Sequence, residues 1–212
     1  MPRPTPTRIY HFTRVEHLLT IVGSGLHCDR RAQGDGLLAI EVGDTGIKAR
    51  RATRVVPVDP GGAVADYVPF YFATRSPMMY SIAMGNVPGY ADGTGRLVYL
   101  ATTVERLVEL GLDVVLSDRN AVLDYAEFVR LGEGEPDDEF IDWPLMDQVM
   151  WNNTEQHPDR MERRMAECLV HGTVPWEAFM AVGAKSQTVN DEAATAIGDG
   201  GPDVLVRPRW YF

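Results

Sequence analysis

The sequence predicts an α+β fold, and two observations lead to it. Strand-like and helix-like segments alternate in the first half of the chain, whereas the second half mixes short strands with irregular stretches, an order typical of α+β proteins rather than of doubly wound parallel sheets. No GxGxxG motif follows a predicted strand and no P-loop occurs, so the common dinucleotide- and nucleotide-binding architectures lack support. The 212 residues suit one domain that spans positions 1–212.

The first predicted strand is "TRIYHFT", whose side chains alternate between two faces. Ile9, His11 and Thr13 lie on one face, and the two aromatic residues lie on the other. We expect Thr13 and Glu16 to form a capping box that starts a helix directly after this strand, and glycines up to Gly25 to end that helix. His11 is therefore expected at a strand end, beside a helix N-terminus.

The later elements follow from aromatic, β-branched and capping patterns. Ser76 followed by Pro77 is typical of an N-cap and the first helical residue, and Thr102 with Glu105 suggests a second capping box. Strands are expected at 67–73, 95–102, 113–118, 165–174 and 203–212, helices at 47–53, 76–85, 102–111 and 121–129, and a helix, a strand or both at 175–186.

The composition indicates a cytoplasmic protein without a membrane partner. No apolar run approaches the roughly 18 to 20 residues that span a bilayer, and the first residues lack the pattern of a signal peptide. Cys28 and Cys168 provide neither a disulfide framework nor a zinc spacing, and no metal site is expected.

The net charge and the charge distribution point in opposite directions on nucleic-acid binding. The formal net charge of −10 argues against a large nucleic-acid surface. Basic residues nevertheless cluster at 48–54, 160–164 and 207–209, and much of the acid lies at 132–142 and 190–203. A local positive groove on an acidic body therefore stays open, although each basic cluster alone is more simply explained as solvated surface.

Three stretches hold the residues that are candidates for catalysis or ligand binding. Glu167 interrupts the apolar run "MAECLVH", which is costly unless the carboxylate lies at a sheet edge, is paired, or works in a cleft. The string "YVPFYFATRSPMMY" reads simply as a core strand with a polar turn, and His11 as a core histidine with its hydrogen bonds satisfied. Neither GxSxG nor HExxH occurs, and Cys168 and His171 point to opposite faces of their strand.

Taken together and in this order, these stretches resemble the diphtheria-toxin-like branch of the ADP-ribosyltransferase superfamily. The whole chain resembles one family within it, the DarT DNA ADP-ribosyltransferase toxins of bacterial toxin–antitoxin systems. The resemblance runs through "PTRIYHFTRVEHLLTIVGSG", "IKARR", "DYVPFYFATRSPMMY", "LSDRNAVL", "RRMAECLVHGTVPW" and "VLVRPRWYF". It implies a split β-sandwich with peripheral helices that clamps NAD+ as co-substrate, without a metal.

The resemblance also implies roles for individual residues. Glu167 and Arg51 would be catalytic, and His11 would hydrogen-bond a ribose hydroxyl of NAD+. The implied NAD+-binding set is His11, Thr13 at the nicotinamide end, Leu19, Gly25, Arg51 and Tyr71 in the nicotinamide pocket. The implied DNA-binding set is Arg54, Arg75, Arg160, Arg164 and Asn120, the last at a position where some members have histidine.

The implied reaction is transfer of ADP-ribose from NAD+ to a base of single-stranded DNA, with thymine favoured. The residue types suit it, because a carboxylate such as Glu167 stabilises the ribosyl cation that forms as nicotinamide leaves. The implied partner is a macrodomain antitoxin, and the protein is expected to be a monomer. Two alternatives stay open: the same fold acting on guanine, RNA or protein, and a non-catalytic module that binds NAD+ or nucleic acid.

Overall fold

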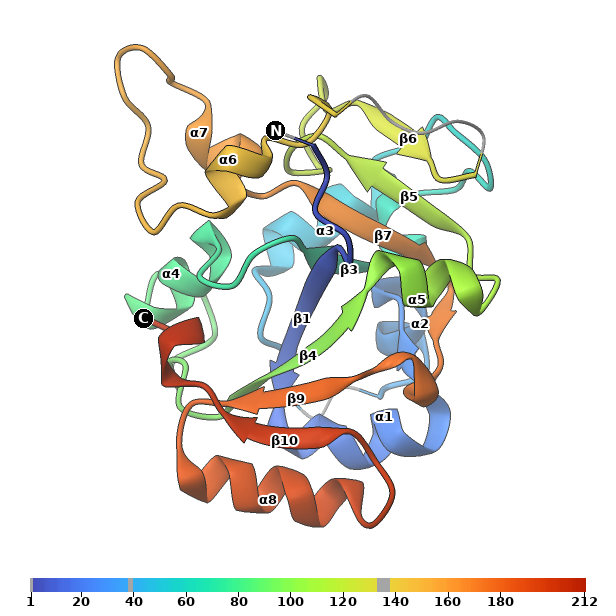
Figure 1. The fold of residues 1–212 in the computed structure, drawn as a ribbon, viewed down its shortest axis with the longest axis vertical. Helices are drawn as coiled ribbons and strands as arrows, with labels where there is room; N and C mark the ends of the chain where they lie inside the picture. Colours follow the sequence, from blue (N-terminus) through green and yellow to red (C-terminus); the bar gives the residue numbers. More distant parts are fainter. Residues whose placement is uncertain (1, 38–39, 133–137) are drawn as a thin grey trace.

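The computed structural model describes residues 2–37, 40–132 and 138–212. Within these residues, eight strands form one sheet in the order β10-β9-β4-β1-β3-β7-β5-β6, and β2 pairs with β8 in a second sheet (Figure 1). Neighbouring strands are antiparallel except for β9 and β10. The strands are β1 (Arg8–Arg14), β2 (Leu26–His27), β3 (Tyr67–Tyr71), β4 (Leu97–Thr103), β5 (Val114–Ser117), β6 (Phe128–Arg130), β7 (Glu167–His171), β8 (Thr173–Val174), β9 (Ala181–Ala184) and β10 (Asp203–Val206).

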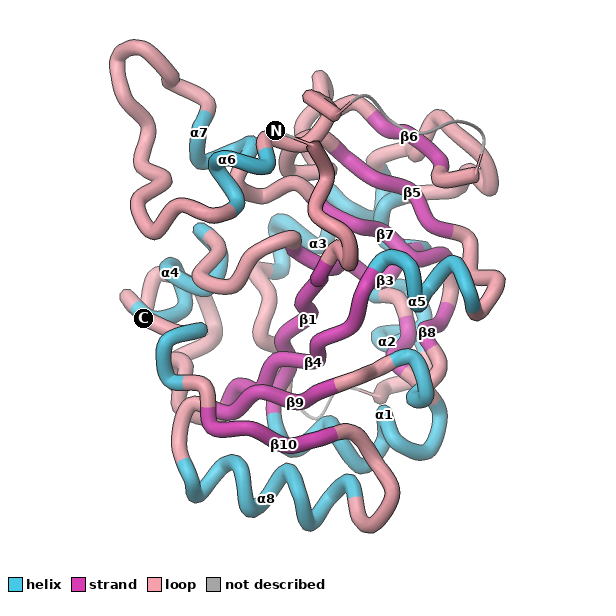
Figure 2. Tube along the Cα trace, in the orientation of Figure 1, coloured by secondary structure: helices cyan, strands magenta, loops and turns pink. Residues whose placement is uncertain are grey.

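The helices are short and lie around the edges and faces of the sheet (Figure 2). They are α1 (Leu18–Ser24), α2 (Asp29–Gly34), α3 (Thr45–Thr53), α4 (Pro77–Ala83), α5 (Val104–Glu109), α6 (Trp143–Met146), α7 (Arg160–Arg163) and α8 (Gln187–Ile197). Among the described residues, no helix combines the length and the apolar character needed to cross a bilayer. The segment that joins α6 to α7 projects from the end of the molecule opposite α8 (Figure 1).

The large sheet is divided at its centre. Strand β1 pairs with β4 along its whole length, from Arg8 opposite Thr103 to Arg14 opposite Leu97. On its other side, β1 meets β3 through the single register pair Tyr10 and Tyr71. The strands therefore separate into two halves, β10-β9-β4-β1 and β3-β7-β5-β6, which agrees with the expected α+β class and split sheet.

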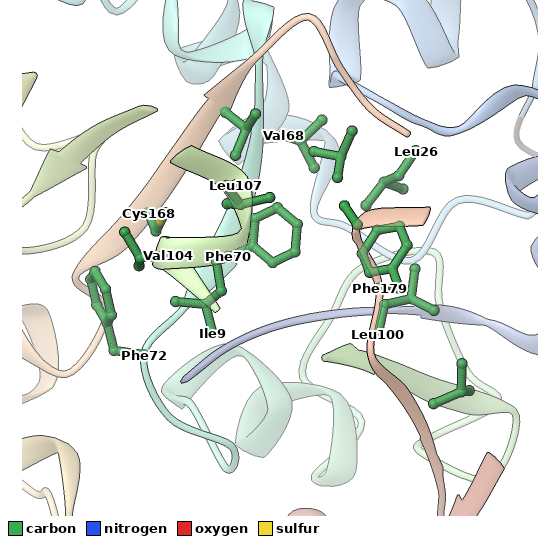
Figure 3. Packing of buried hydrophobic residues seen from close by; sticks show 14 of the residues in the cluster. Ile9, Leu26, Val68, Phe70, Phe72, Leu100, Val104, Leu107, Cys168 and Phe179 are labelled. Carbon is green, nitrogen blue, oxygen red and sulfur yellow. The ribbon is translucent and has the colours of Figure 1, made fainter. Parts of the chain in front are cut away.

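The two faces of β1 belong to different parts of the core. Ile9 packs with Phe70, Leu100 and Phe179 in the main apolar cluster (Figure 3). Phe12 points to the opposite face and packs in a second cluster beneath α4. The period of two in "TRIYHFT" thus sets which side chains face each layer.

Several elements confirm the sequence patterns. Helix α3 covers the expected 47–53 segment, and α4 begins at Pro77 with Ser76 Oγ accepting a hydrogen bond from Met79 N at 3.2 Å. The 175–186 segment contains both a 3₁₀ turn, Trp176–Ala178, and strand β9. Predicted strand 165–174 forms β7 and β8, and predicted strand 203–212 shortens to β10.

The capping box expected at Thr13 and Glu16 is wrong. Strand β1 continues to Arg14, and a 3₁₀ turn over Val15–His17 precedes α1. The hydroxyl of Thr13 hydrogen-bonds to the ring of His17, and Glu16 pairs with Arg14 and Arg96. Pairing with β4 and these side-chain contacts outweigh the local capping preference.

The second capping box is also wrong, by one position. Thr103 is the N-cap of α5, and its Oγ1 accepts from Arg106 N at 3.1 Å. Thr102 instead donates to Ala178 O at 2.6 Å, and Glu105 accepts from Thr7 N.

Two further segments differ from expectation. The helix predicted at 121–129 is absent from the described structure, which has turns followed by β6. Helix α8 lies across the stretch interpreted only as an acidic cluster, and it links the parallel strands β9 and β10. Of the other acidic cluster, 132–142, residues 133–137 lie outside the described part of the chain.

Candidate active site

A cavity of about 420 Å³ lies where the two halves of the sheet meet. Its walls come from β1, β3 and β7 and from helices α1 to α4. Polar groups at the wall include His11, Thr13, His17, Thr20, Asp29, Glu41, Lys48, Arg51, Tyr71, Ser81, Asn120 and Glu167. Mostly apolar pockets of this size with a few convergent polar groups are typical of small-molecule and cofactor sites.

Glu167 opens β7, which is an interior strand. Its register partners are Tyr71 on β3 and Ser117 on β5, so the edge-strand explanation for this glutamate is excluded. The residue is 1% exposed. Its Oε2 accepts from Arg51 Nη1 at 2.9 Å, and its Oε1 accepts from Ala121 N at 3.1 Å. A buried carboxylate is costly unless paired, and here both oxygens have donors.

Arg51 projects from α3 into the cavity wall and is 7% exposed. Burial acts to lower its pKa, but the carboxylates of Glu167 and Asp29 outweigh burial and raise the pKa. Its Nε lies 3.3 Å from Asp29 Oδ2, an ion pair without hydrogen-bond geometry. Within the described residues, Nε and Nη2 are buried and make no hydrogen bond. Nη2 is therefore a buried donor with neither a hydrogen bond nor an ion pair among the described residues, as expected of a group that a ligand satisfies.

An ionic network beside this pair was not found from the sequence. Lys48 Nζ lies 3.2 Å from Asp29 Oδ1 and 2.7 Å from Glu41 Oε2. Asp29 thus contacts both Lys48 and Arg51 and holds the two cations on α3 next to one another. No local pattern predicts this network, because "KARRATR" appears only as a basic cluster and its acidic partners lie on other segments.

His11 is hydrogen-bonded to the protein through one ring nitrogen and also lines the cavity. Its Nδ1 lies 2.8 Å from Pro69 O, and since a carbonyl only accepts, Nδ1 carries the proton. Burial lowers the pKa of His11, with the Pro69 hydrogen bond acting in the opposite direction. The neutral ring therefore leaves Nε2 as a hydrogen-bond acceptor on a residue that lines the cavity.

All but one of the other residues expected to contact NAD+ lie at the wall of the cavity. Thr13, Gly25 and Tyr71 line the cavity, whereas Leu19 lies outside it with 71% of its surface exposed. Burial raises the pKa of Tyr71, so its hydroxyl stays protonated. Gly25 has φ 84°, and an added Cβ would lie 2.8 Å from Val174 O, so a side chain does not fit there.

The expected DNA contacts divide into one cavity residue and four arginines engaged elsewhere. Asn120 lines the cavity, with its Oδ1 accepting from Val122 N. The cavity wall, as described, includes none of the four arginines. Arg54 donates to the carbonyls of Asp124 and Ala126, Arg75 stacks over the ring of Phe212, Arg160 donates to Gln148 Oε1 and to the carbonyls of Met150 and Asn152, and Arg164 donates to the carbonyls of Leu145, Met146 and Thr74.

Arg164 is the most buried of these four arginines. It is 4% exposed, and burial lowers its pKa to about 10. We expect Arg164→Met to lower the free energy of unfolding by roughly 3 kcal/mol, because two buried carbonyls and one half-buried carbonyl lose their charged donor. Urea denaturation measures this loss, and the exposed Arg207→Met serves as a control that should change stability by less than about 0.5 kcal/mol.

The same variant distinguishes a structural arginine from a phosphate contact. At a temperature where Arg164→Met stays folded, the dependence of DNA affinity on salt should match that of the unmodified protein. A decrease of about 0.7 in the slope of log K against log salt, the value for one phosphate contact on single-stranded DNA, would instead identify Arg164 as a phosphate contact.

Comparisons with known proteins connect this cavity to one family. The family model described as "ssDNA thymidine ADP-ribosyltransferase, DarT" matches residues 10–212. The chain is 36% identical over 217 residues to a "DNA ADP-ribosyl transferase" of Mycobacterium tuberculosis, covering 99% of this chain and 91% of that protein.

Solved structures give the same result. The structure described as "Thermus sp. 2.9 DarT in complex with ADP-ribosylated ssDNA" matches with a TM-score of 0.89 at 30% identity over 100% of both chains. The same Thermus protein in complex with NAD+ matches with a TM-score of 0.86 over 99% of both chains. A DarTG of Thermosipho africanus, in complex with ADP-ribose, shares the fold at 18% identity and a TM-score of 0.79, covering 97% of this chain and 51% of that one. The split sheet, the cavity and a match over nearly the whole length agree: the chain belongs to the DarT family of ssDNA thymidine ADP-ribosyltransferases.

Proposed function

We propose that this chain transfers ADP-ribose from NAD+ to a thymine base in single-stranded DNA, with Glu167 and Arg51 as its catalytic residues. The observation that carries the assignment of residues is the buried pair of Glu167 and Arg51 at the wall of the cavity between the half-sheets. Membership of the DarT family supports this reaction. Glu167 provides the negative charge and Arg51 the positive charge that the reaction needs.

Glu167 acts on the sugar and on the attacking base. As the bond between the ribose C1′ and the nicotinamide nitrogen breaks, positive charge develops on the ribose, and the fixed carboxylate stabilises it. A ring nitrogen of thymine then forms the new bond to C1′ and loses its proton, for which the carboxylate of Glu167 is the acceptor. Nicotinamide leaves with the electron pair of the broken bond.

Arg51 serves this step through the guanidinium nitrogens that make no hydrogen bond within the described protein. Nη1 holds Glu167, while Nε and Nη2 make no hydrogen bond among the described residues. Oxygens of the NAD+ pyrophosphate or of the target base are matched to such planar donors.

The remaining cavity residues bind and orient NAD+. Nε2 of His11 accepts a hydrogen bond from a ribose hydroxyl, and the ring of Tyr71 packs against the nicotinamide. Gly25 lets the end of α1 pack closely against Val174, where a side chain would not fit, and so shapes this part of the cavity wall. Asn120, which lines the cavity, faces the acceptor base, whereas Arg54, Arg75 and Arg160 shape the segments around it. A macrodomain antitoxin that removes the adduct is the partner proposed with this activity.

The test is incubation of the protein with NAD+ and single-stranded oligonucleotides that contain only one kind of reactive base, read by intact mass. We expect one ADP-ribose unit to be added to thymine-containing strands. Addition only to guanine-containing strands, or to RNA or protein, would replace the thymine assignment. Failure to consume NAD+ with any acceptor would favour a non-catalytic binding module.

A further inference from the structure

His17 is a buried histidine in the cavity wall that has no role in the reaction proposed above. It ends the 3₁₀ turn Val15–His17, directly after β1, and is 4% exposed. It contributes to the cavity wall close to Thr13. A histidine enclosed in this way has its ring nitrogens committed to specific partners.

The partners of the two ring nitrogens settle which one carries the proton. Nδ1 lies 2.9 Å from Thr13 Oγ1, and Nε2 lies 3.5 Å from Ile40 N. A backbone N–H only donates, so Nε2 is the acceptor and the proton of the neutral ring is on Nδ1. Burial lowers the pKa of His17. Glu16 and Glu41 act to raise it, and Arg14 and Lys48 act to lower it, so the neutral form prevails near pH 7.

This arrangement fixes the direction of the hydroxyl of Thr13. Because Nδ1–H donates into Oγ1, the hydroxyl proton must point away from His17. Thr13 is 7% exposed and lines the cavity. We propose that His17 is a positioning residue that makes Thr13 a hydrogen-bond donor to an acceptor oxygen of bound NAD+. This inference rests on the proposed use of NAD+ by this cavity.

The consequence is that β1 presents two groups of opposite polarity to the dinucleotide. His11 offers an acceptor at Nε2, and Thr13 offers a donor at Oγ1. A sugar hydroxyl matches the first, and a carbonyl oxygen matches the second. His17 also accepts from Ile40 N and thereby links β1 to the segment that precedes α3.

The test is a double-mutant cycle on Thr13→Val and His17→Phe, measured as KM for NAD+ in transfer and as Kd for NAD+ by calorimetry. Each single variant should raise both constants about fivefold, the size expected for one neutral hydrogen bond. The double variant should raise them no further, because His17 acts through the hydroxyl that Thr13→Val removes. A purely structural His17 would multiply the two effects to about 25-fold and overturn the proposal.

Two conservative variants give a second criterion. His17→Asn places an amide nitrogen where Nδ1 lies and should recover most of the affinity, whereas His17→Gln places its amide near Nε2 and should not. Equal losses in both variants would contradict the proposal. All variants are compared at a temperature where thermal melting shows them folded.

If the unmodified protein binds NAD+ without transferring ADP-ribose to DNA, the proposed function fails and the Kd cycle still decides the role of His17. If NAD+ does not bind, both fail.

Discussion

Replacing Glu167 by glutamine is expected to lower the rate of ADP-ribose transfer by about 100- to 1000-fold, the range measured when one preorganised electrostatic group is removed from an active site. Glutamine keeps the size of the side chain and retains an oxygen for Ala121 N, which now donates to Oε1 at 3.1 Å. What it removes is the negative charge facing the ribose. The loss should therefore appear in kcat, with a smaller change in KM for NAD+.

The buried position of Glu167 calls for a control on folding. The substitution also removes the charge that faces Arg51 Nη1, and breaking a buried ion pair commonly costs several kcal/mol. Retention of Asp29 near Arg51 limits that cost. Thermal melting and NAD+ binding show whether the variant is folded, and the exposed Glu177→Gln should keep full activity. A folded Glu167→Gln protein with more than about a tenth of normal activity would show that the carboxylate is not the catalytic charge.

The parts of the fold that the sequence predicted are those whose cause is local. Alternation in "TRIYHFT" sets the two faces of β1, and Ser76 with Pro77 starts α4, because each depends on a few neighbouring residues. The helix α8 was missed despite a signal of the same kind. Val189, Ala193 and Ile197 are buried at a spacing of four, but the acidic residues between them suggested a surface loop.

The capping errors have a tertiary cause. Thr13 and Glu16 have the sequence of a capping box, yet β4 extends its pairing along β1 to Arg14, and His17 binds the hydroxyl that would have capped the helix. The cap moved to Thr103 in α5 because Thr102 faces the core and donates to Ala178 O. Local preferences of about 1 kcal/mol are readily overridden by such contacts.

The candidate site could be predicted in part for the same reason. The sequence shows a charged glutamate in an apolar strand, where burial of an unpaired charge is costly. In the structure this cost is offset because Glu167 pairs with Arg51. That Asp29 and Glu41 join Lys48 could not be seen, because the three residues come from separate segments. The DNA-contacting roles of the arginines stay predictions, and for Arg164 the sequence shows its charge but not that three carbonyls surround its guanidinium.

Replacing Arg51 by lysine is expected to lower kcat about 100-fold while leaving the protein folded. Lysine keeps the positive charge opposite Glu167, but it replaces three nitrogens in one plane by a single ammonium group. The donor Nη2, which makes no hydrogen bond among the described residues, is lost, and with it any hydrogen bond that it gives to the substrate. Arg50→Lys, on the exposed side of the same helix, is the matched control and should change the rate less than twofold, as is usual for surface positions.

A comparison of single and double variants tests whether Arg51 and Glu167 act as one unit. Since Arg51 Nη1 holds the carboxylate of Glu167 in place, Arg51→Lys added to Glu167→Gln should cost much less than it does alone. Single-turnover rates with saturating NAD+ and thymine-containing DNA give the required values. Independent effects that multiply would mean that Arg51 acts on the substrate alone, and a normal rate in Arg51→Lys would mean that only its charge matters. A joint effect is the expected result, because Nη1 orients the catalytic carboxylate while Nη2 of the same group has no partner among the described residues and is proposed to bind the substrate.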